Sequence, residues 1–451
     1  MFIIDESGKV LIQCDKEASG IITIPPFIEV IGKRCFENCN NIKEIIVPNS
    51  VRIIEQGAFE ECRSLEVVRL SNNIEVIESC VFSYCISLKS INLSSKISTI
   101  KWRAFQMCSS LNTLEFPSEL ITIESEAFIG SGLYSIVLNG NIEIIDDYAF
   151  CNCHDLQHLS LPSTLKTMKS GAFRGCENLQ DVEIPMGVEF IGKDVFAGCD
   201  SLNYIQIPSS VLYIGSGAFA ASKIASISVS KNNPNYKSID GVLFSKDLSV
   251  LHTYPRAKVD TTYRIPFETS IIEASAFLGC LKLQNVEFHN QIRQLGVESF
   301  CNTGIINLLL PNSLEVIPKA CFRACSSLVS VSFPTSIKDI EEFAFCDCRR
   351  LLNVSIPISV KYIGKSAFCF GYGLLSVRIP NNVEFIGRGA FGWSKVKELY
   401  IGIEDLSKVK EEFTDYIDYD NCILYVPFGM KLIYGKHPFF SKFKQIISAD
   451  I

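Results

Sequence analysis

The stretch VRIIEQGAFEECRSLEVVRLS, residues 51–71, carries the pattern that decides the fold. Its Phe recurs along the chain at steps of 23 residues, with two steps of 22. The recurring residues are Phe36, Phe59, Phe82, Phe105, Phe128, Phe150, Phe173, Phe196, Phe219, and then Phe277, Phe300, Phe322, Phe345, Phe368 and Phe391. A fixed period of this length is the signature of a stacked repeat architecture. We therefore predict one repeating coil instead of a series of separate globular domains.

Each part of the repeat has a physical reading. In L-x-x-V-x-I, shown by Leu65, Val68 and Leu70, the last two apolar residues are two apart, as in a half-buried strand. A proline often follows and ends the strand, because it lacks a ladder donor. The next apolar pair, such as Val188 and Ile191, predicts a second inward segment. The Phe buries one ring per turn, and stacked copies would form a continuous spine that one unit could not bury alone.

The A-F-x-x-C-x-x-L-x-x-V-x-I-P unit resembles the BspA-like leucine-rich repeat family over residues 20–401. The resemblance implies a right-handed leucine-rich repeat solenoid. It is expected to be mainly β, with a strand ladder on one face and short turns or helical turns elsewhere. We divide the chain into an N-terminal cap (1–19), a first block of repeats (20–230), an inserted hairpin (231–268), a second block (269–401) and a C-terminal cap (402–451), all in one continuous solenoid.

Residues 232–258, NNPNYKSIDGVLFSKDLSVLHTYPRAK, interrupt the register after Phe219. Asp240-Gly241 marks a turn, VLF and VLHTY predict short strands, and residues 245–247 lie between them as a hairpin tip. The hairpin either decorates a coil or has a specific function.

The register stops again after Ile401. LSKVKEEFTDYI, residues 406–417, is compatible with a short helix, and residues 421–446 resemble the closing segment of bacterial family members. Because the end of a solenoid exposes a cross-section of its core, an atypical cap is expected there. The segments FIID and KVLIQC would serve the same purpose at the N-terminal end.

Nineteen cysteines are present, and ten of them occupy the slot three residues after a repeat Phe. They are Cys39, Cys62, Cys85, Cys108, Cys153, Cys176, Cys199, Cys280, Cys325 and Cys348. Where Ser131, Ser222, Thr303 or Ser394 fills the slot, the next apolar residue comes one position early, so the slot belongs to a turn. A small, weakly polar cysteine pointing inward explains this pattern. Reduced thiols are the simpler expectation, while disulfides between neighbouring coils remain open for an exported protein.

CNCHDLQH, residues 151–158, contains a C-x-C-H-x3-H arrangement that could hold a metal through Cys151, Cys153, His154 and His158. Structural zinc sites more often show C-x2-C. In the repeat register, Cys153 is the shared turn cysteine and His158 is an outward strand residue. We therefore predict no metal and no cofactor.

Two further motifs suggest enzymes. GKS at 364–366 has the ending of a phosphate-binding loop, but Ser359 stands where that motif needs Gly, and IGKR and IGKD occur at the same corner of other repeats. Asp247, Ser249 and His252 form a nominal triad, yet residues this close in one hairpin rarely make one, so we interpret them as surface polar residues. The sequence predicts a protein that is not an enzyme, with a hydrolase site in the hairpin as a distant alternative.

Binding is expected on the outward residues of the strand ladder, which are mostly small and polar and mildly acidic. Interaction hot spots favour Tyr, Trp and Arg. The candidate binding residues are Arg69, His158, Asp181, Glu183, Tyr204, Gln206, Arg378 and Tyr400.

Charge and hydropathy narrow the class of partner. The net charge of −7 gives no basic surface for nucleic acid, and no run of 18 apolar residues predicts a membrane span. We expect a monomer that binds a protein partner, such as a host or extracellular protein, as surface-exposed members of the resembling family do in adhesion. Residues 1–17 do not read as a signal peptide, so the expected location is the cell surface or the exterior if a leader was removed, and otherwise the cytoplasm as a scaffold.

Overall fold

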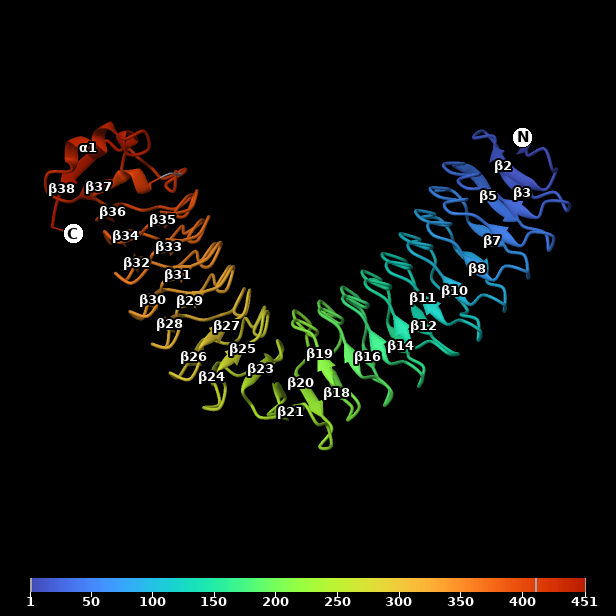
Figure 1. The fold of residues 1–451 in the computed structure, drawn as a ribbon, viewed down its shortest axis with the longest axis horizontal. Coiled ribbons are helices and arrows are strands. Elements are labelled where there is room, and N and C mark those ends of the chain that lie inside the picture. Colours follow the sequence, from blue (N-terminus) through green and yellow to red (C-terminus); the bar gives the residue numbers. More distant parts are fainter. Residues whose placement is uncertain (1, 410–411, 451) are drawn as a thin grey trace. The chain divides into compact units, whose positions relative to one another are not determined.

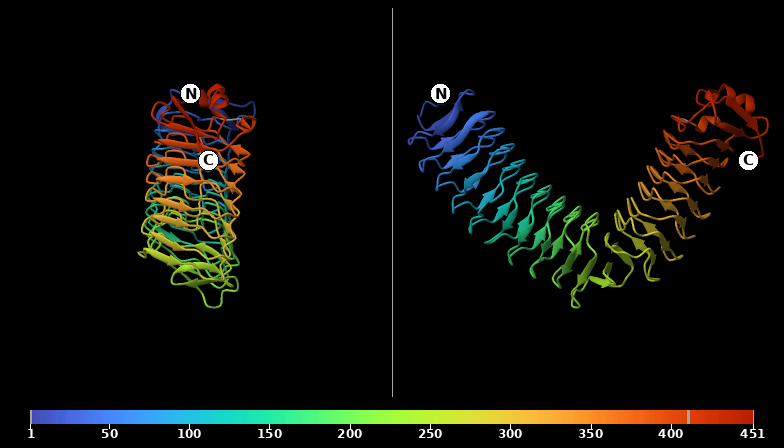
Figure 2. Two further views of the ribbon diagram at one scale, coloured as in Figure 1. Left: turned by 90° about the vertical axis from the view of Figure 1, so that its left-hand side faces the viewer. Right: turned by 180° about the vertical axis from the view of Figure 1, so that it is seen from behind.

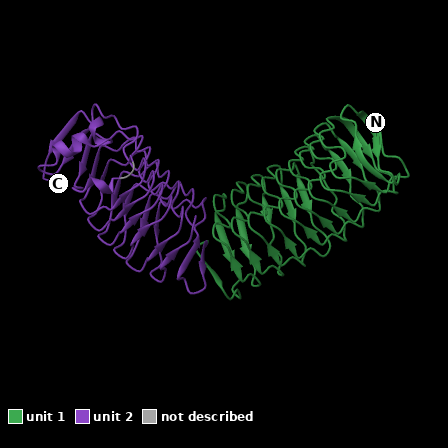
Figure 3. Cartoon of the chain, turned by 45° about the horizontal axis from the view of Figure 1, so that its top comes forward, with its two compact units in different colours: residues 1–241 green, residues 242–451 purple. Residues whose placement is uncertain are grey.

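The computed structural model describes residues 2–409 and 412–450. The chain divides into two compact units, Met1–Gly241 and Val242–Ile451 (Figure 3). Within each unit, short parallel strands stack coil upon coil, and helices are almost absent from the described residues (Figures 1 and 2). The chain is a mainly β solenoid, as the repeat predicts.

In unit 1, the L-x-x-V-x-I segments form a first ladder of parallel strands. These are β3 (Ser19–Thr23), β5 (Asn41–Ile46), β7 (Val67–Arg69), β9 (Ser90–Asn92), β12 (Ser135–Val137), β14 (His158–Ser160), β16 (Asp181–Val182), β18 (Tyr204–Ile207) and β20 (Ser226–Val229), with β21 (Tyr236–Ile239) beside β20. Pairing is offset by one repeat, so that His158 lies opposite Ser135 and Asp181. In β18 the side chains alternate between exposed and buried, which confirms the predicted inward and outward positions.

A second ladder in unit 1 consists mostly of two-residue strands. They are β1 (Phe2–Ile4), β2 (Val10–Cys14), β4 (Val30–Ile31), β6 (Ile53–Ile54), β8 (Val76–Ile77), β10 (Thr99–Ile100), β11 (Thr122–Ile123), β13 (Ile144–Ile145), β15 (Thr167–Met168), β17 (Phe190–Ile191) and β19 (Tyr213–Ile214). In the two-residue strands the second residue is buried and the first faces outward or lies half-buried. This is the second inward segment that the sequence predicts.

Unit 2 repeats the arrangement. Its first ladder contains β24 (Thr262–Arg264), β26 (Asn285–Glu287), β28 (Asn307–Leu309), β30 (Ser330–Ser332), β32 (Asn353–Ser355), β34 (Ser376–Ile379), β36 (Glu398–Ile401), β37 (Ile423–Val426) and β38 (Gln445–Ser448). The second contains β23 (Val250–Thr253), β25 (Ile271–Ile272), β27 (Gln294–Leu295), β29 (Val316–Ile317), β31 (Asp339–Ile340), β33 (Tyr362–Ile363) and β35 (Phe385–Ile386). β22 (Val242–Ser245) pairs antiparallel with β23 and forms the hairpin.

The repeat phenylalanines stack into a buried spine in each unit. Phe128, for example, is fully buried and lies 5.1 Å, centroid to centroid, from both Phe105 and Phe150. Its backbone N–H donates to the carbonyl of Ala149 in the next coil, at 2.8 Å. Ring stacking and backbone bonds therefore follow the same one-repeat register.

Tyr254 occupies a spine slot that holds Phe in the other repeats. It precedes Phe277 by 23 residues, stacks on it at 5.0 Å, and donates its N–H to the carbonyl of Ala276. β23 and β24 pair in parallel with strands of the following coil. Residues 250–264, which the sequence register leaves outside the repeats, thus build a coil of the solenoid.

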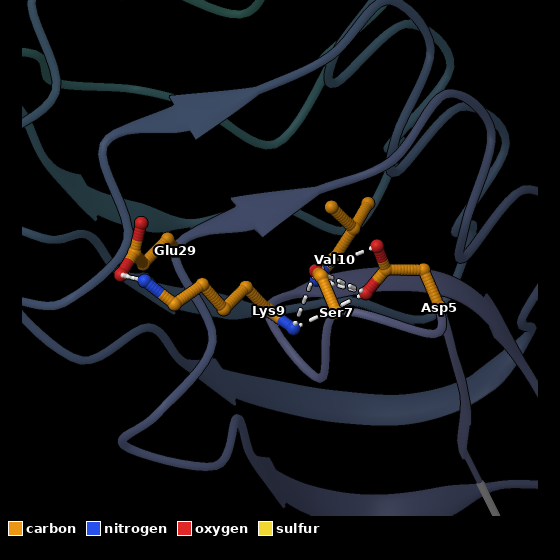
Figure 4. Close-up of polar contacts among 5 residues, drawn as sticks. All are labelled: Asp5, Ser7, Lys9, Val10 and Glu29. Carbon is orange, nitrogen blue, oxygen red and sulfur yellow. Dashed lines mark hydrogen bonds and ion pairs between the residues drawn. The ribbon is translucent and has the colours of Figure 1, made fainter.

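At the N-terminal end, β1 and β2 pair antiparallel around a turn organised by Asp5 (Figure 4). The Asp5 carboxylate accepts bonds from the Ser7 hydroxyl at 2.7 Å and from the Val10 N–H at 2.9 Å. These hydrogen bonds lower the pKa of Asp5, and the bond from Ser7 has the largest effect. Lys9 joins this turn to the next coil through Glu29, Nζ to Oε1 at 2.6 Å.

The C-terminal segment differs from expectation in two ways. The helix suggested for residues 406–417 is wrong in the described part, where only the 3-10 turn η1 (Leu406–Lys408) forms; residues 410–411 lie outside the described residues. The ladders also do not end at Ile401, because β37 and β38 extend the first one and Phe413 accepts a bond from the Phe391 N–H.

Helical turns between β37 and β38 close the core at this end. α1 (Lys431–Lys436) and η2 (Phe440–Lys442) bring buried Tyr434 and Phe440 against each other, and Phe440 meets Phe413 edge-on at 5.8 Å. The Tyr434 hydroxyl donates to the carbonyl of Ile403 at 2.6 Å. These aromatic rings cover the last coil, as the end of a solenoid requires.

The shared cysteine slot has a structural role. Cys62, Cys85 and Cys108 are fully buried, and each thiol donates to the carbonyl of a spine Phe about one coil back, at 3.0, 3.2 and 3.1 Å. Where Ser222 replaces cysteine, its hydroxyl donates to the carbonyl of Phe219 within its own coil, at 2.6 Å. The predicted inward turn position is confirmed, and the weak S–H donor explains why cysteine fits it.

Candidate functional site: the strand-ladder face

The eight predicted binding residues all lie on the first ladder or directly beside a strand of it, and none is buried. Six belong to unit 1 and two, Arg378 and Tyr400, to unit 2. Strand alternation explains their direction, since residues two apart on a strand share one face.

In unit 1 several of these side chains already have partners. Arg69 forms an ion pair with Glu44 one coil earlier, Nε to Oε1 at 2.7 Å. The His158 ring meets the edge of Tyr134 at 5.6 Å. The Tyr204 hydroxyl lies 2.5 Å from that of Ser228. Asp181, Glu183 and Gln206 are exposed on or beside the strands between these contacts.

In unit 2 the structure brings Arg378 and Tyr400 together. The guanidinium carbon lies 3.9 Å from the centre of the Tyr400 ring, a cation–π contact. On its other side, Tyr400 stacks on Tyr425 at 4.3 Å with an interplanar angle of 6°. Burial raises the pKa of Tyr400, so its hydroxyl stays protonated and donates to Glu398 at 3.3 Å. We name Arg378, Tyr400 and Tyr425 the tyrosine cluster.

Sequence reasoning missed two aromatic members of this face. Tyr425 lies beyond the repeat register, and its only signal is the strand-like stretch ILYV at 423–426. Tyr134 immediately precedes β12 and is therefore skipped by strict alternation, although it is 44% exposed and contacts His158. Its presence shows that residues flanking the short strands also contribute to the face.

The ladder face is hollowed in each unit. In unit 1 a groove of about 1030 Å³ is lined by residues that include Arg69, Asn92 and Val137. Residues 113–115 also line this groove, and they form no strand. In unit 2 a groove of about 970 Å³ is lined by residues that include Phe288 and Leu309. Both grooves mix polar and apolar side chains, which suits an extended polypeptide more than a small molecule.

The CNCHDLQH residues do not converge on one point. The Cys153 thiol is buried and donates to the carbonyl of Phe128 at 3.3 Å, and burial raises its pKa to about 12. A metal ligand must be a thiolate, so this cysteine is poorly suited. His154 Nδ1 lies 3.5 Å from Glu177 Oε1, while His158 stands on the ladder face. Among the described residues, no group of three His, Cys, Asp or Glu side chains is placed to hold a metal.

The backbone of the GKS corner is hydrogen bonded to neighbouring coils. The Gly364 N–H donates to the carbonyl of Ile340 at 2.7 Å, and the Ser366 N–H to that of Arg388 at 3.1 Å. A Cβ on Gly364 would lie 2.4 Å from the backbone N of Glu342. The glycine therefore permits close stacking of coils, and these two amides point at carbonyls instead of a phosphate.

The nominal triad separates into two environments. The exposed Asp247 carboxylate accepts bonds from the hydroxyls of Ser245 and Ser249, both at 2.7 Å, and these bonds lower its pKa to about 2. His252 follows buried Leu251 on β23 and is itself half-buried, and desolvation lowers its pKa to about 4. The interpretation as surface polar residues holds for Asp247, while His252 is half-buried. Asp247 serves to order the hairpin tip.

Comparison with known proteins supports the repeat assignment. Residues 17–133, 121–250, 260–370 and 294–417 match the family described as BspA type leucine rich repeat region, with six copies. The chain belongs to the BspA-type leucine-rich repeat family. Proteins of this fold are usually not enzymes and typically bind other proteins.

Solved structures resemble this BspA-type chain over most of its length. A leucine rich cell surface protein from Faecalibacterium prausnitzii aligns with a TM-score of 0.55 and 24% identity, over 83% of this chain and 92% of that one. The pneumococcal vaccine antigen PcpA aligns with a TM-score of 0.48 and 20% identity, over 98% and 92%. A leucine-rich repeat protein from Bacteroides ovatus gives 0.46 and 25%, over 92% and 96%. The first of these likenesses shows the shared fold.

No curated protein matches the chain. Within residues 2–409 and 412–450, no helix has the length and apolar character needed to cross a bilayer.

Proposed function

We propose that the protein is an interaction module that acts at the cell surface or outside the cell, and that its ladder face binds an extended segment of a host or other extracellular protein. The observation that carries the proposal is the tyrosine cluster, which presents an arginine and two stacked tyrosines on adjacent strands. These are the residue types that dominate interaction hot spots. The long parallel ladder offers many further contacts of lower energy to the same partner.

The composition of the face supports a protein partner over other classes. Arg69 is paired with Glu44, and Asp181 and Glu183 are exposed nearby, so the face lacks the basic stripe that nucleic acid requires. The Tyr400 ring is held between Arg378 and Tyr425, so binding would immobilise little additional side-chain freedom.

Replacing Tyr400 by Ala should weaken binding by at least about tenfold, because it removes the ring that contacts both other members of the cluster. The measurement is surface plasmon resonance against a panel of purified extracellular proteins. Lys361→Ala, on the other ladder of the same unit, is the matched control and should bind as wild type. Equal affinity of Tyr400→Ala and wild type for every binding protein would contradict the proposal.

Location outside the cell leads to a separate prediction about the thiols of Cys346 and Cys369. The sulfur atoms of Cys346 and Cys369 lie 2.8 Å apart on neighbouring coils, and both residues are buried. In an oxidising compartment we expect them to form a disulfide, which peptide mass spectrometry of protein recovered under non-reducing conditions would detect. Cys369→Ser is the control. Two free thiols in protein recovered from its native cells would instead favour the intracellular scaffold.

A further inference from the structure

A row of exposed aromatic rings lies on one corner of the last coils of unit 2. Phe370, Trp393 and Tyr416 come from three successive coils and stack in sequence, at 6.0 and 3.9 Å between ring centroids. Tyr372 packs beside Phe370 at 6.3 Å. Trp393 is 47% exposed and Tyr416 64% exposed. We name these four residues the corner ridge.

The backbone conformation at the corner ridge is a regular feature of the repeat. Phe370, Trp393 and Tyr416 have φ of 56°, 55° and 62°, in the left-handed region that disfavours large side chains. The first two stand two residues after a spine Phe, a slot that in other coils holds residues as different as Gly175 and Tyr84. The slot therefore accepts side chains of any size, and what distinguishes this corner is that exposed aromatic rings from three successive coils stack there.

Apolar surface continues beyond the rings. Leu352 and Leu375 directly precede strands β32 and β34, at the edge of the ladder face, and are 41% and 43% exposed. The Leu375 N–H donates to the carbonyl of Leu352, which fixes these side chains in adjacent rows. Contiguous exposed apolar side chains on a soluble domain typically mark an interaction site.

Positively charged side chains outnumber negatively charged ones around the corner ridge. Asp347 and Asp415 are each held by an arginine, Arg349 at 2.7 Å and Arg388 at 3.1 Å. The exposed cations Arg350, Lys395 and Lys397 have no ion pair within the described part of the chain. Of the other acidic groups nearby, Glu412 pairs with Lys442, while Glu398 keeps its negative charge and accepts a bond from Tyr400 on the ladder face. In a protein of net charge −7, this corner is locally basic.

From these observations we infer that the corner ridge is a second docking surface, which binds an acidic, apolar-cored polypeptide segment of a partner protein. The stacked rings remain partly exposed, and within the described part of the chain the Trp393 indole N–H and the Tyr416 hydroxyl make no hydrogen bond, so both can donate to a partner. Carboxylates of the partner would meet Arg350, Lys395 and Lys397 around an apolar centre. Trp, Tyr and Arg are the residues enriched in such hot spots.

Trp393 itself provides the reporter. Only Trp102 and Trp393 are present, so Trp102→Phe leaves a single indole on the ridge. Two synthetic peptides serve as probes: one with a Leu-Phe-Leu centre flanked by glutamates, and one with lysines in place of the glutamates. We expect the glutamate peptide alone to give a saturable blue shift of the fluorescence, with affinity on the order of micromolar.

Variants separate docking from folding. Asn occupies the same slot at Asn38, Asn152 and Asn302, so Phe370→Asn keeps the backbone conformation. In the single-tryptophan protein this change should weaken peptide binding at least tenfold while thermal unfolding stays close to the parent. Tyr84→Asn, at the same left-handed slot in unit 1, is the matched control and should leave binding unchanged.

Three outcomes would overturn the inference: no saturable shift with the glutamate peptide, an equal shift with the lysine peptide, or a shift with vesicles containing phosphatidylserine in place of the peptide response. The last would identify the ridge as a membrane contact. None of these outcomes bears on binding by the ladder face, which is tested through Tyr400.

Discussion

Replacing Phe128 by Ala should lower the free energy of unfolding by about 3–5 kcal/mol, the range for truncating a buried aromatic ring. Phe128 is fully buried and contacts three rings: Phe105 and Phe150 in the stack, and Phe116 edge-on at 5.6 Å. The substitution opens a cavity between two coils whose backbones are hydrogen bonded in register, so the cavity cannot collapse without breaking those bonds. Urea denaturation followed by circular dichroism measures the loss.

The matched control is Phe190→Ala. Phe190 also stacks on an aromatic neighbour, Tyr213 at 4.7 Å, but it lies on the outer side of the second ladder and is 38% exposed. Its removal should cost only about 1 kcal/mol, because little surface returns to water and no cavity forms. Equal losses in the two variants would show that the spine is not the main source of stability.

The repeat register predicted the phenylalanine spine and the buried strand faces, because each depends on local spacing in the sequence. A Phe every 23 residues specifies which ring meets which, and the pair of apolar residues two apart specifies which strand face is buried. The same register placed Arg378 and Tyr400 on one face of the ladder. It also explained Cys153 as a turn residue without invoking a metal.

What sequence missed are features that depart from the repeat. Tyr254 fills a Phe slot with a different aromatic residue, so a search by residue identity passed over a whole coil. Tyr425 joins the tyrosine cluster through a strand that lies beyond the last recognisable repeat. The partial burial of His252 could not be predicted, because in a hairpin that packs on neighbouring coils both strand faces can be covered in part.

The partial burial of His252 predicts that the folded protein loses stability in acid. Its pKa is about 4 in the folded protein, against about 6.5 for an ordinary histidine, so the unfolded chain binds the proton more readily. The contribution is therefore fully present above pH 6.5, declines as the pH falls, and is lost by about pH 4. At pH 4.5 the folded protein should be less stable than at pH 7 by about 2–3 kcal/mol from this group.

Substitution isolates this contribution from other titrating groups. His252→Gln removes the proton-binding site, so its stability should fall less than that of wild type between pH 7 and pH 4.5. His158→Gln removes an imidazole from the exposed ladder face and should leave the acid-induced loss as in wild type. Asp247 acts in a lower window, below pH 4, because its pKa is reduced to about 2. Urea unfolding at pH 7 and pH 4.5 measures the stability of wild type, His252→Gln and His158→Gln. If His252→Gln lost as much stability in acid as wild type, another group would have to be the one that the fold keeps uncharged.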